Sequence, residues 1–216
     1  MEEKQEGRKK ELLFILALTA AASFLLLTNL SGQYLWQDEA ETALISKTIL
    51  TEGLPRGYDG RNYFSQEGPY PYGKDHIWIL SPWLSYYLTA FSFRLLGVNA
   101  FAARLPFAVF GVFSVIATFF LARSITGRFR CAVIAAVLLM MSVPFLVHMR
   151  QCRYYSLAVF FTITSLYSYV LIIHRPVLGR VAFAVSSLLL FHTQPVYCAV
   201  LLTSVTLHSM FLGAKY

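Results

Sequence analysis

The chain has 216 residues, of which 57% are hydrophobic and only 13% are charged, and its mean hydropathy is +0.57. A soluble fold of this size could not bury that much apolar surface, so the composition indicates a membrane protein. The net charge of +7 is expected from Lys and Arg on the cytoplasmic side and does not indicate nucleic-acid binding. We interpret Cys131, Cys152 and Cys198 as structural, because they lie in or beside apolar segments without metal-binding spacing.

The N-terminal residues 1–11 carry charges of both signs, and an uncharged apolar run of 19 residues follows at 12–30. That run is long enough to cross a hydrocarbon core and longer than the apolar part of a signal peptide. No small-residue cleavage site follows it. The sequence therefore predicts a cytoplasmic tail at 1–11 and a first transmembrane helix at 12–30.

Further apolar segments follow after a long polar stretch at 31–76. They cover residues 77–97, 105–122, 131–147, 154–173, 177–191 and 196–212. Each is expected to be helical, because a backbone with unpaired polar groups is not tolerated in lipid. The predicted fold class is an all-α polytopic membrane protein.

The distribution of basic residues predicts the topology. The tail, with Lys9 and Lys10, and the basic clusters at 123–130 and 175–180 should all be cytoplasmic. These positions are consistent with one another if segment 77–97 does not cross the membrane but lies in the interface or dips in and returns. Its proline, arginine and aromatic residues are typical of the interface.

We therefore expect about six transmembrane helices. The predicted organisation is an exoplasmic, catalytic loop at 31–104 with interfacial juxtamembrane helices, followed by a transmembrane bundle at 105–216. Arg104, Arg150, Arg153 and His192 then lie on the exoplasmic side. A transporter would instead tend to place polar groups near the middle of the membrane.

The carboxylates are confined to the first part of the chain. Of the eleven, four precede the first apolar run and seven lie between Asp38 and Asp75, with none after Asp75. Any acid–base or metal chemistry that uses this chain's own carboxylates in the predicted exoplasmic region must therefore use the polar loop.

Asp38 opens the loop within the segment 36–41. It begins a predicted amphipathic helix with Ala40, Ala43, Leu44, Ile49 and Leu50 on one side. Two interpretations stay open for Asp38. It is a general base held just outside the bilayer, or it caps the helix in a capping box with Glu41.

Three other polar sites also keep two interpretations each. Glu67 lies in a stiff acidic-proline segment that either approaches Asp38 or forms a solvated turn. Arg150 and Arg153 either clamp a phosphate or extend toward lipid head groups. His192 interrupts an apolar run, either as a ligand and hydrogen-bond donor or as part of a polar turn that ends a helix.

Several motifs in their order resemble membrane glycosyltransferases of the GT-C type. The group most similar is the protein mannosyltransferase and aminoarabinose transferase superfamily, glycosyltransferase family 39 and its bacterial relatives. The motifs are Asp38-Glu39-Ala40, the acidic-proline segment, Leu96-Gly97, residues 101–106 (FAARLP) and residues 153–157 (RYYSL). Together they extend over roughly residues 10–200.

The resemblance implies transfer of a sugar from a polyprenyl-phosphate donor to an acceptor hydroxyl, with inversion, at the exoplasmic face of the cell (inner) membrane. It implies Asp38 as the base, with Glu39 and Glu67 as further catalytic carboxylates. The implied donor phosphate and head-group ligands are Arg104, Arg150, Arg153 and Lys74. Glu67 and His192 are candidate ligands of a divalent metal. The implied partners are the lipid-linked sugar, the bilayer, and an acceptor protein, lipid or glycan.

The chain also departs from the family pattern. Glu67-Gly68-Pro69 lacks the family's Lys, for which Lys74 is the candidate substitute, and no acid follows Arg153. Family members are generally much longer, so we expect the bundle to be incomplete, as in a partial product or a minimal module. Two rival functions stay open: a non-catalytic subunit of a larger assembly, and a transporter or flippase of a lipid-linked sugar.

Overall fold

The computed structural model describes residues 2–64 and 73–211, and these form an all-helical protein. Its α-helices are α1 (Glu2–Leu27), α2 (Gln37–Glu52), α3 (Leu84–Leu96), α4 (Ala100–Thr126), α5 (Phe129–Met140), α6 (Val143–Met149), α7 (Tyr155–Leu171), α8 (Pro176–Phe191) and α9 (Pro195–Phe211), with a short 3-10 helix at Lys74–His76. Within the described ranges there is no β-strand, apart from isolated bridges between Arg56 and Ile77 and between Tyr58 and Tyr63.

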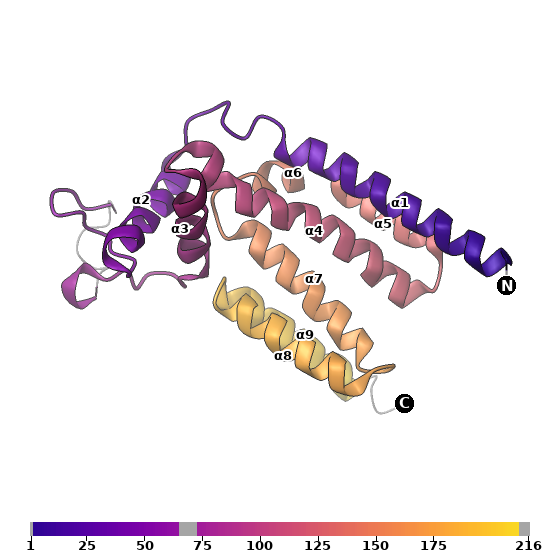
Figure 1. Cartoon of the computed structure of the whole chain (residues 1–216). Coiled ribbons are helices and arrows are strands. Elements are labelled where there is room, and N and C mark those ends of the chain that lie inside the picture. Colours follow the sequence, from indigo (N-terminus) through magenta and orange to yellow (C-terminus); the bar gives the residue numbers. More distant parts are fainter. Residues whose placement is uncertain (1, 65–72, 212–216) are drawn as a thin grey trace.

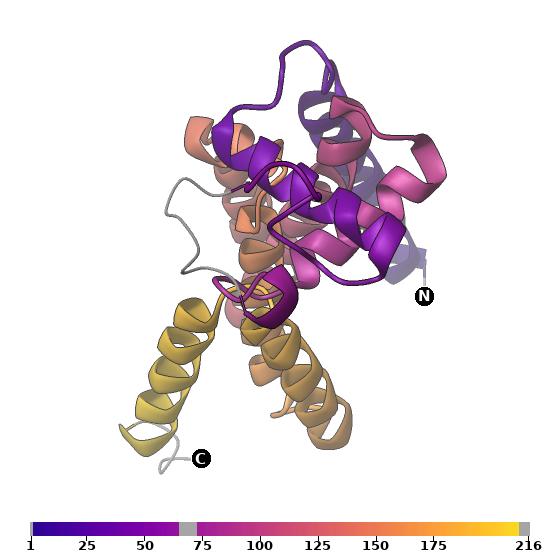
Figure 2. The same ribbon diagram turned by 90° about the vertical axis from the view of Figure 1, so that its left-hand side faces the viewer.

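The long helices run lengthwise beside one another, and α2 and α3 gather at one end of this bundle (Figure 1). That end, which we call the α2 end, is where α1 finishes and where α4 and α7 begin. Figure 2 shows α9 diverging from the other helices. Segment 77–97, which we expect not to cross the membrane, contains the short helix α3, and α3 packs against α2.

Helix length identifies two candidate membrane spans, with a third possible. Residues Lys9–Leu27 of α1 and the whole of α4 are each long and apolar enough to cross a membrane, and α5 with α6 qualifies if the bent pair is one span. Helices α7, α8 and α9 have 16 to 17 residues. A full hydrocarbon core needs about 20. The six predicted crossings are therefore not confirmed by helix length.

One predicted helix, at 131–147, is wrong as an uninterrupted element. Helix α5 ends at Met140, and α6 begins at Val143 after a bend of 65°. Pro144 lies in the first turn of α6. Its ring would clash with the carbonyl of Met140 in a continuous helix, and it has no backbone N–H to donate, so the helix breaks here.

Close packing joins α1, α4 and α6 near the α2 end. Gly111 in α4 faces Met149 and Leu26, and a Cβ at this position would lie 2.8 Å from Met149 Cβ and 3.1 Å from Leu26 Cδ1. The absence of a side chain is therefore what allows these three helices to approach. At the opposite end, Glu11 of α1 pairs with Arg123 of α4 at 3.7 Å, as expected for antiparallel neighbours.

The predicted apolar side of α2 is wrong in part. Ala43 is buried and Ile49 packs against the core, but Leu44 and Leu50 are exposed, whereas Thr42 and Ser46 are buried. Burial of these hydroxyls costs little because each donates to a backbone carbonyl four residues earlier, Thr42 Oγ1 to Asp38 at 3.1 Å and Ser46 Oγ to Thr42 at 2.6 Å. Small polar side chains thereby allow α3 to pack on α2.

Candidate functional site

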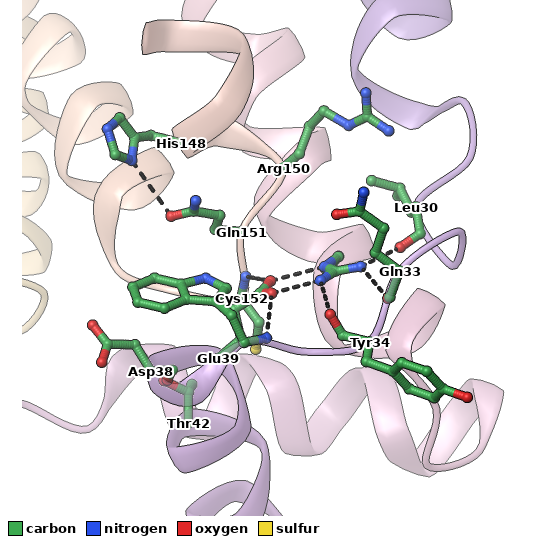
Figure 3. Close-up of polar contacts among 12 residues, drawn as sticks. Leu30, Gln33, Tyr34, Asp38, Glu39, Thr42, His148, Arg150, Gln151 and Cys152 are labelled. Atoms are coloured by element: carbon green, nitrogen blue, oxygen red, sulfur yellow. Dashed lines mark hydrogen bonds and ion pairs between the residues drawn. The ribbon is translucent and has the colours of Figure 1, made fainter.

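The first turn of α2 carries two adjacent carboxylates that point to different sides. Figure 3 shows Glu39 directed into a cluster of polar contacts and Asp38 directed away from it. Glu39 is fully buried, whereas 35% of the Asp38 side chain is exposed. Neighbours in a helix lie about 100° apart around its axis, so one helix turn presents one carboxylate to the interior and one to the surface.

The helix-cap interpretation of Asp38 is wrong. Helix α2 begins at Gln37, and the residue that precedes it is Trp36. The backbone N–H of Trp36 donates to the Glu39 carboxylate at 3.4 Å, so Glu39 provides the capping contact. The Asp38 carboxylate instead accepts a hydrogen bond from Arg153.

Arg104 engages all five N–H groups of its guanidinium. Nε and Nη2 donate to the two carboxylate oxygens of Glu39 at 2.8 and 2.6 Å. The remaining donors bind the backbone carbonyls of Leu30 and Gln33, from Nη1 at 2.8 and 2.9 Å, and of Tyr34, from Nη2 at 3.1 Å. A guanidinium has five donors and no acceptor. In this arrangement Arg104 therefore fixes the connection between α1 and α2 and has no donor left for another ligand.

Glu39 also holds the connection between α6 and α7. Its Oε1 accepts from the backbone N–H of Cys152 at 2.8 Å, and Cys152 Sγ lies 3.6 Å from Thr89 Oγ1 of α3. Burial raises the pKa of the Cys152 thiol to about 12. The thiol is therefore neutral at physiological pH, in keeping with its structural interpretation, and one carboxylate ties together α2, α4 and the α6–α7 connection (Figure 3).

Arg153 lies between two carboxylates of α2. Its Nη2 donates to Asp38 Oδ2 at 2.9 Å, and its Nη1 lies 3.4 Å from Glu41 Oε1 and 3.4 Å from Thr42 Oγ1. Burial alone would lower the pKa of Arg153, but the charges of Asp38 and Glu41 outweigh it, so the pKa rises above its ordinary value. Arg153 is thus a permanent cation, and its Nε is buried without a partner among the described residues.

Arg150 binds the end of α1. Its Nη2 donates to the carbonyls of Thr28 and Asn29 at 2.5 and 3.3 Å, and its Nη1 donates to that of Leu25 at 3.5 Å. The last carbonyls of a helix have no partner within the helix, and a cation there also complements the helix dipole. Arg150 therefore fixes the point at which α1 leaves the bundle.

Two cavities flank the start of α2. The first, which we call the Glu41 cavity, has a volume of about 110 Å³ and is lined by Glu41, Thr42, Trp78, Leu80, Ser81, Pro82, Ser85, Tyr86, Arg153, Tyr154 and Thr193. The second, which we call the Arg150 cavity, has a volume of about 380 Å³ and is lined by Asn29, Leu30, Gly32, Gln33, Trp36, Glu39, Arg104, Val147, Arg150 and Gln151. Residues of the α1–α2, α2–α3, α6–α7 and α8–α9 connections line these cavities, together with acids of α2 and several arginines. The predicted gathering of acids and arginines at one end of the bundle therefore agrees with the structure.

Three predicted site residues are not brought into this cluster. Glu67 lies outside the described residues. Lys74 and His192 are exposed, and neither lines the Glu41 or the Arg150 cavity. Among residues 2–64 and 73–211, no group of three or more His, Cys, Asp or Glu side chains could hold a metal ion. The metal interpretation of Glu67 and His192 therefore stays a prediction.

The Glu41 cavity also contains residues that are not predicted as site residues from the sequence. Glu41 was interpreted only as part of a helix cap, and Trp78 and Tyr86 only as part of an interfacial segment. One signal was available for Glu41, because residues three apart on a helix share a face and Glu41 follows Asp38 at that spacing. No comparable local signal points to Trp78 or Tyr86, whose burial depends on the packing of α3 against α2.

A comparison with known families identifies the class of protein. Residues 81–190 match the family described as dolichyl-phosphate-mannose-protein mannosyltransferase. With its apolar helices, this makes the chain a membrane glycosyltransferase. It belongs to the dolichyl-phosphate-mannose-protein mannosyltransferase family, which confirms the resemblance seen in the sequence. No curated protein and no solved structure matched the chain.

The matched residues cover part of the site. Arg104, Arg150 and Arg153 lie within them, whereas Asp38 and Glu39 lie before them. The structure nevertheless joins the two parts, because Glu39 binds Arg104 and Asp38 binds Arg153.

Proposed function

We propose that the chain transfers a sugar from a polyprenyl-phosphate donor to an acceptor hydroxyl at the exoplasmic face of the cell membrane, with inversion. One observation carries the assignment of the base. Asp38 is a partly exposed carboxylate, oriented by Arg153 at 2.9 Å, next to a cavity at one end of the bundle. A general base has to be accessible to its substrate and held in a defined orientation, and Asp38 meets both conditions.

The proposed reaction needs one proton transfer and one displacement. Asp38 accepts the proton of the acceptor hydroxyl as its oxygen attacks the anomeric carbon. The bond between that carbon and the phosphate oxygen breaks on the opposite side, so polyprenyl phosphate leaves and the configuration inverts. Cationic groups then stabilise the negative charge of the departing phosphate.

The other site residues divide by their contacts. Glu39 and Arg104 are positioning residues, since their bonds are directed to the protein itself. Arg153 orients Asp38, and Arg150 lines the larger cavity with its Nε not engaged in any of its bonds to α1. We keep Arg150 and Lys74 as proposed ligands of the donor phosphate or head group, and Glu67 as a proposed third carboxylate.

We further propose six crossings, made by α1, α4, the bent pair α5–α6, α7, α8 and α9, with the N-terminus cytoplasmic. This arrangement is supported by the lengthwise order of these helices in Figure 1. The basic clusters at 123–130 and 175–180 then share one side with the start of α1, as the positive-inside rule requires. Helices shorter than the bilayer core can be accommodated by local thinning of the bilayer.

Transfer assays with a panel of polyprenyl-phosphate sugars test the proposal. Asp38→Asn should lower the transfer rate by about 100-fold or more, because it removes the base. Asp59→Asn is the matched control, since Asp59 lies exposed in the same loop and its carboxylate binds the neighbouring residues Arg61 and Asn62. Normal transfer by Asp38→Asn, or a folded wild-type chain that transfers no sugar from any donor, would contradict the proposal.

A further inference from the structure

The Glu41 cavity combines three kinds of surface. Trp78 and Tyr86 are almost fully buried and provide aromatic walls. Thr42, Ser81 and Ser85 provide hydroxyl groups, and Glu41 and Arg153 provide opposite charges. The aromatic wall of the cavity is held in place by hydrogen bonds. Ser81 Oγ accepts from Trp78 Nε1 at 3.0 Å and lies 2.6 Å from Tyr86 Oη.

The charges of the cavity argue against a phosphate ligand. The cation Arg153 is in contact with two carboxylates, Asp38 and Glu41, so these three groups together are negative. An anion placed beside Glu41 would be repelled by that carboxylate. A neutral ligand with several hydroxyl groups meets no such penalty, because a carboxylate accepts hydroxyl hydrogen bonds and a guanidinium donates to hydroxyl oxygens.

The size of the cavity restricts the ligand further. A volume of about 110 Å³ accommodates the hydroxyl-bearing edge of one ring rather than a sugar with its phosphate and lipid. Hydroxyl and charged groups suit this edge, and the aromatic side chains suit the C–H groups between its hydroxyls. The cavity also adjoins Asp38, since Arg153 bridges Asp38 and Glu41.

We infer that the Glu41 cavity binds the hydroxyl-bearing edge of the pyranose ring of the transferred sugar, with Glu41 accepting hydrogen bonds from ring hydroxyls as a specificity-determining residue. The inference rests on the proposed function only for the statement that this ring is the one transferred. Arg153 then has a double role, since it orients both the base and the residue that binds the sugar. The negative phosphate lies outside this cavity.

Direct binding tests the inference without any transfer step. The whole chain is kept in solution by an amphipathic polymer that contains neither sugar nor phosphate. It is mixed with methyl α-mannopyranoside or methyl β-glucopyranoside, and saturation-transfer NMR reports binding. At least one pyranoside should bind, and inorganic phosphate should not displace it. Glu41→Ala should weaken binding by about tenfold or more, because a hydrogen bond to a charged group is lost. Glu52→Gln on the same helix, outside the cavity, should leave binding unchanged.

Two further variants keep the test decisive. Ser85→Ala removes a single cavity hydroxyl and should weaken binding even if Glu41→Ala fails to fold. Asp38→Asn should retain pyranoside binding while transfer is lost, so failure of the catalytic assignment and failure of the sugar site are distinguishable. The inference is overturned if phosphate displaces the pyranoside, if neither pyranoside binds, or if folded Glu41→Ala and Ser85→Ala bind as the wild type does. In transfer assays, Glu41→Gln should raise KM for the donor more than it lowers kcat.

Discussion

Glu39 and Arg104 form a bidentate ion pair in which both carboxylate oxygens are bound, at 2.8 and 2.6 Å, although 65 residues separate the two side chains. The pair joins the first turn of α2 to the second turn of α4 at the α2 end. A buried charge without its partner is costly, so each residue makes the other necessary. Arg104 in addition binds three carbonyls of the α1–α2 connection.

Arg104→Ala should therefore reduce the free energy of unfolding by about 3–5 kcal/mol, the usual effect of removing one partner of a buried pair. Arg104→Lys should be intermediate, because an ammonium restores the charge but not the planar set of five donors. Denaturant titration in detergent measures both. Lys10→Ala is the control, because its pair with Glu6 is exposed and should contribute less than about 1 kcal/mol. Equal effects of Arg104→Ala and Lys10→Ala would contradict the structural role.

The adjacent carboxylates should respond differently to neutralisation. Glu39→Gln places an amide against Arg104 and the Cys152 N–H, so it should lower the unfolding free energy by about 2 kcal/mol or more. Asp38→Asn should change it by less than about 1 kcal/mol, because the Asp38–Arg153 pair is partly exposed. The two variants are compared by the same titration. A greater loss of stability for Asp38→Asn than for Glu39→Gln would contradict the positioning role of Glu39.

Cys152 should resist alkylation in the folded protein. Burial raises its pKa to about 12, and the thiolate is the reactive form. Between pH 7 and 9, single-cysteine chains that retain Cys152 should react with maleimide far more slowly than those that retain the partly exposed Cys131. Unfolding in detergent should remove the difference.

The same shift predicts a dependence of stability on pH. The ordinary pKa of a Cys thiol is 9.0, whereas that of Cys152 in the folded chain is about 12, so only the unfolded chain ionises between these limits. The contribution of Cys152 is therefore complete below pH 9 and is lost as the pH rises toward 12. Comparison of Cys152→Ser with the wild type across this range measures it. A wild type whose stability rose through the same range relative to the variant would have the wrong sign.

Gly111→Ala should destabilise the bundle by about 1–3 kcal/mol. The new methyl would lie 2.8 Å from Met149 Cβ, and overpacking of a close contact forces the helices apart. Gly60→Ala provides a contrast, because no atom lies within 4 Å of the added Cβ there, although its φ of +91° adds local strain. Thermal unfolding in detergent distinguishes them. A change at Gly111 no larger than that at Gly60 would exclude close packing as the reason for this glycine.

Cysteine labelling in intact cells tests the proposed orientation. In a chain without its three native cysteines, an impermeant reagent applied outside should reach a cysteine at position 59 but not one at 128. Both positions are exposed, so protection at 128 reports the side of the membrane rather than burial. Labelling of 128 from outside would overturn the topology, and permeabilised cells provide the control in which both positions react.

The features predictable from the sequence were those that depend on composition and short-range pattern. Apolar runs predicted the helices. The predicted topology also placed Arg123 and Arg153 at opposite ends of the bundle, as in the structure. The break after Met140 was missed, although Pro144 marks it, because the apolar run continues through the proline.

The contacts that define the site could not be predicted in the same way. Glu39 and Asp38 are chemically similar neighbours, and which of them is buried depends on where α4 and the α6–α7 connection lie. The five acceptors of Arg104 are drawn from α2 and the connection before it, residues distant from Arg104 in the sequence. No local pattern shows that all five donors of Arg104 are occupied. Binding of a phosphate was therefore an equally reasonable interpretation of Arg104.

The opposite directions of Asp38 and Glu39 make the length of the α1–α2 connection a determinant of chemistry. Deletion or insertion of one residue between Asn29 and Trp36 would shift the carbonyls that Arg104 binds relative to Glu39, so that one guanidinium could no longer bind both. Arg104 of α4 and Arg150, which follows α6, bind carbonyls of this connection and so hold it at a defined length. Natural variation should therefore tolerate changes of residue type in this segment far better than changes in its length.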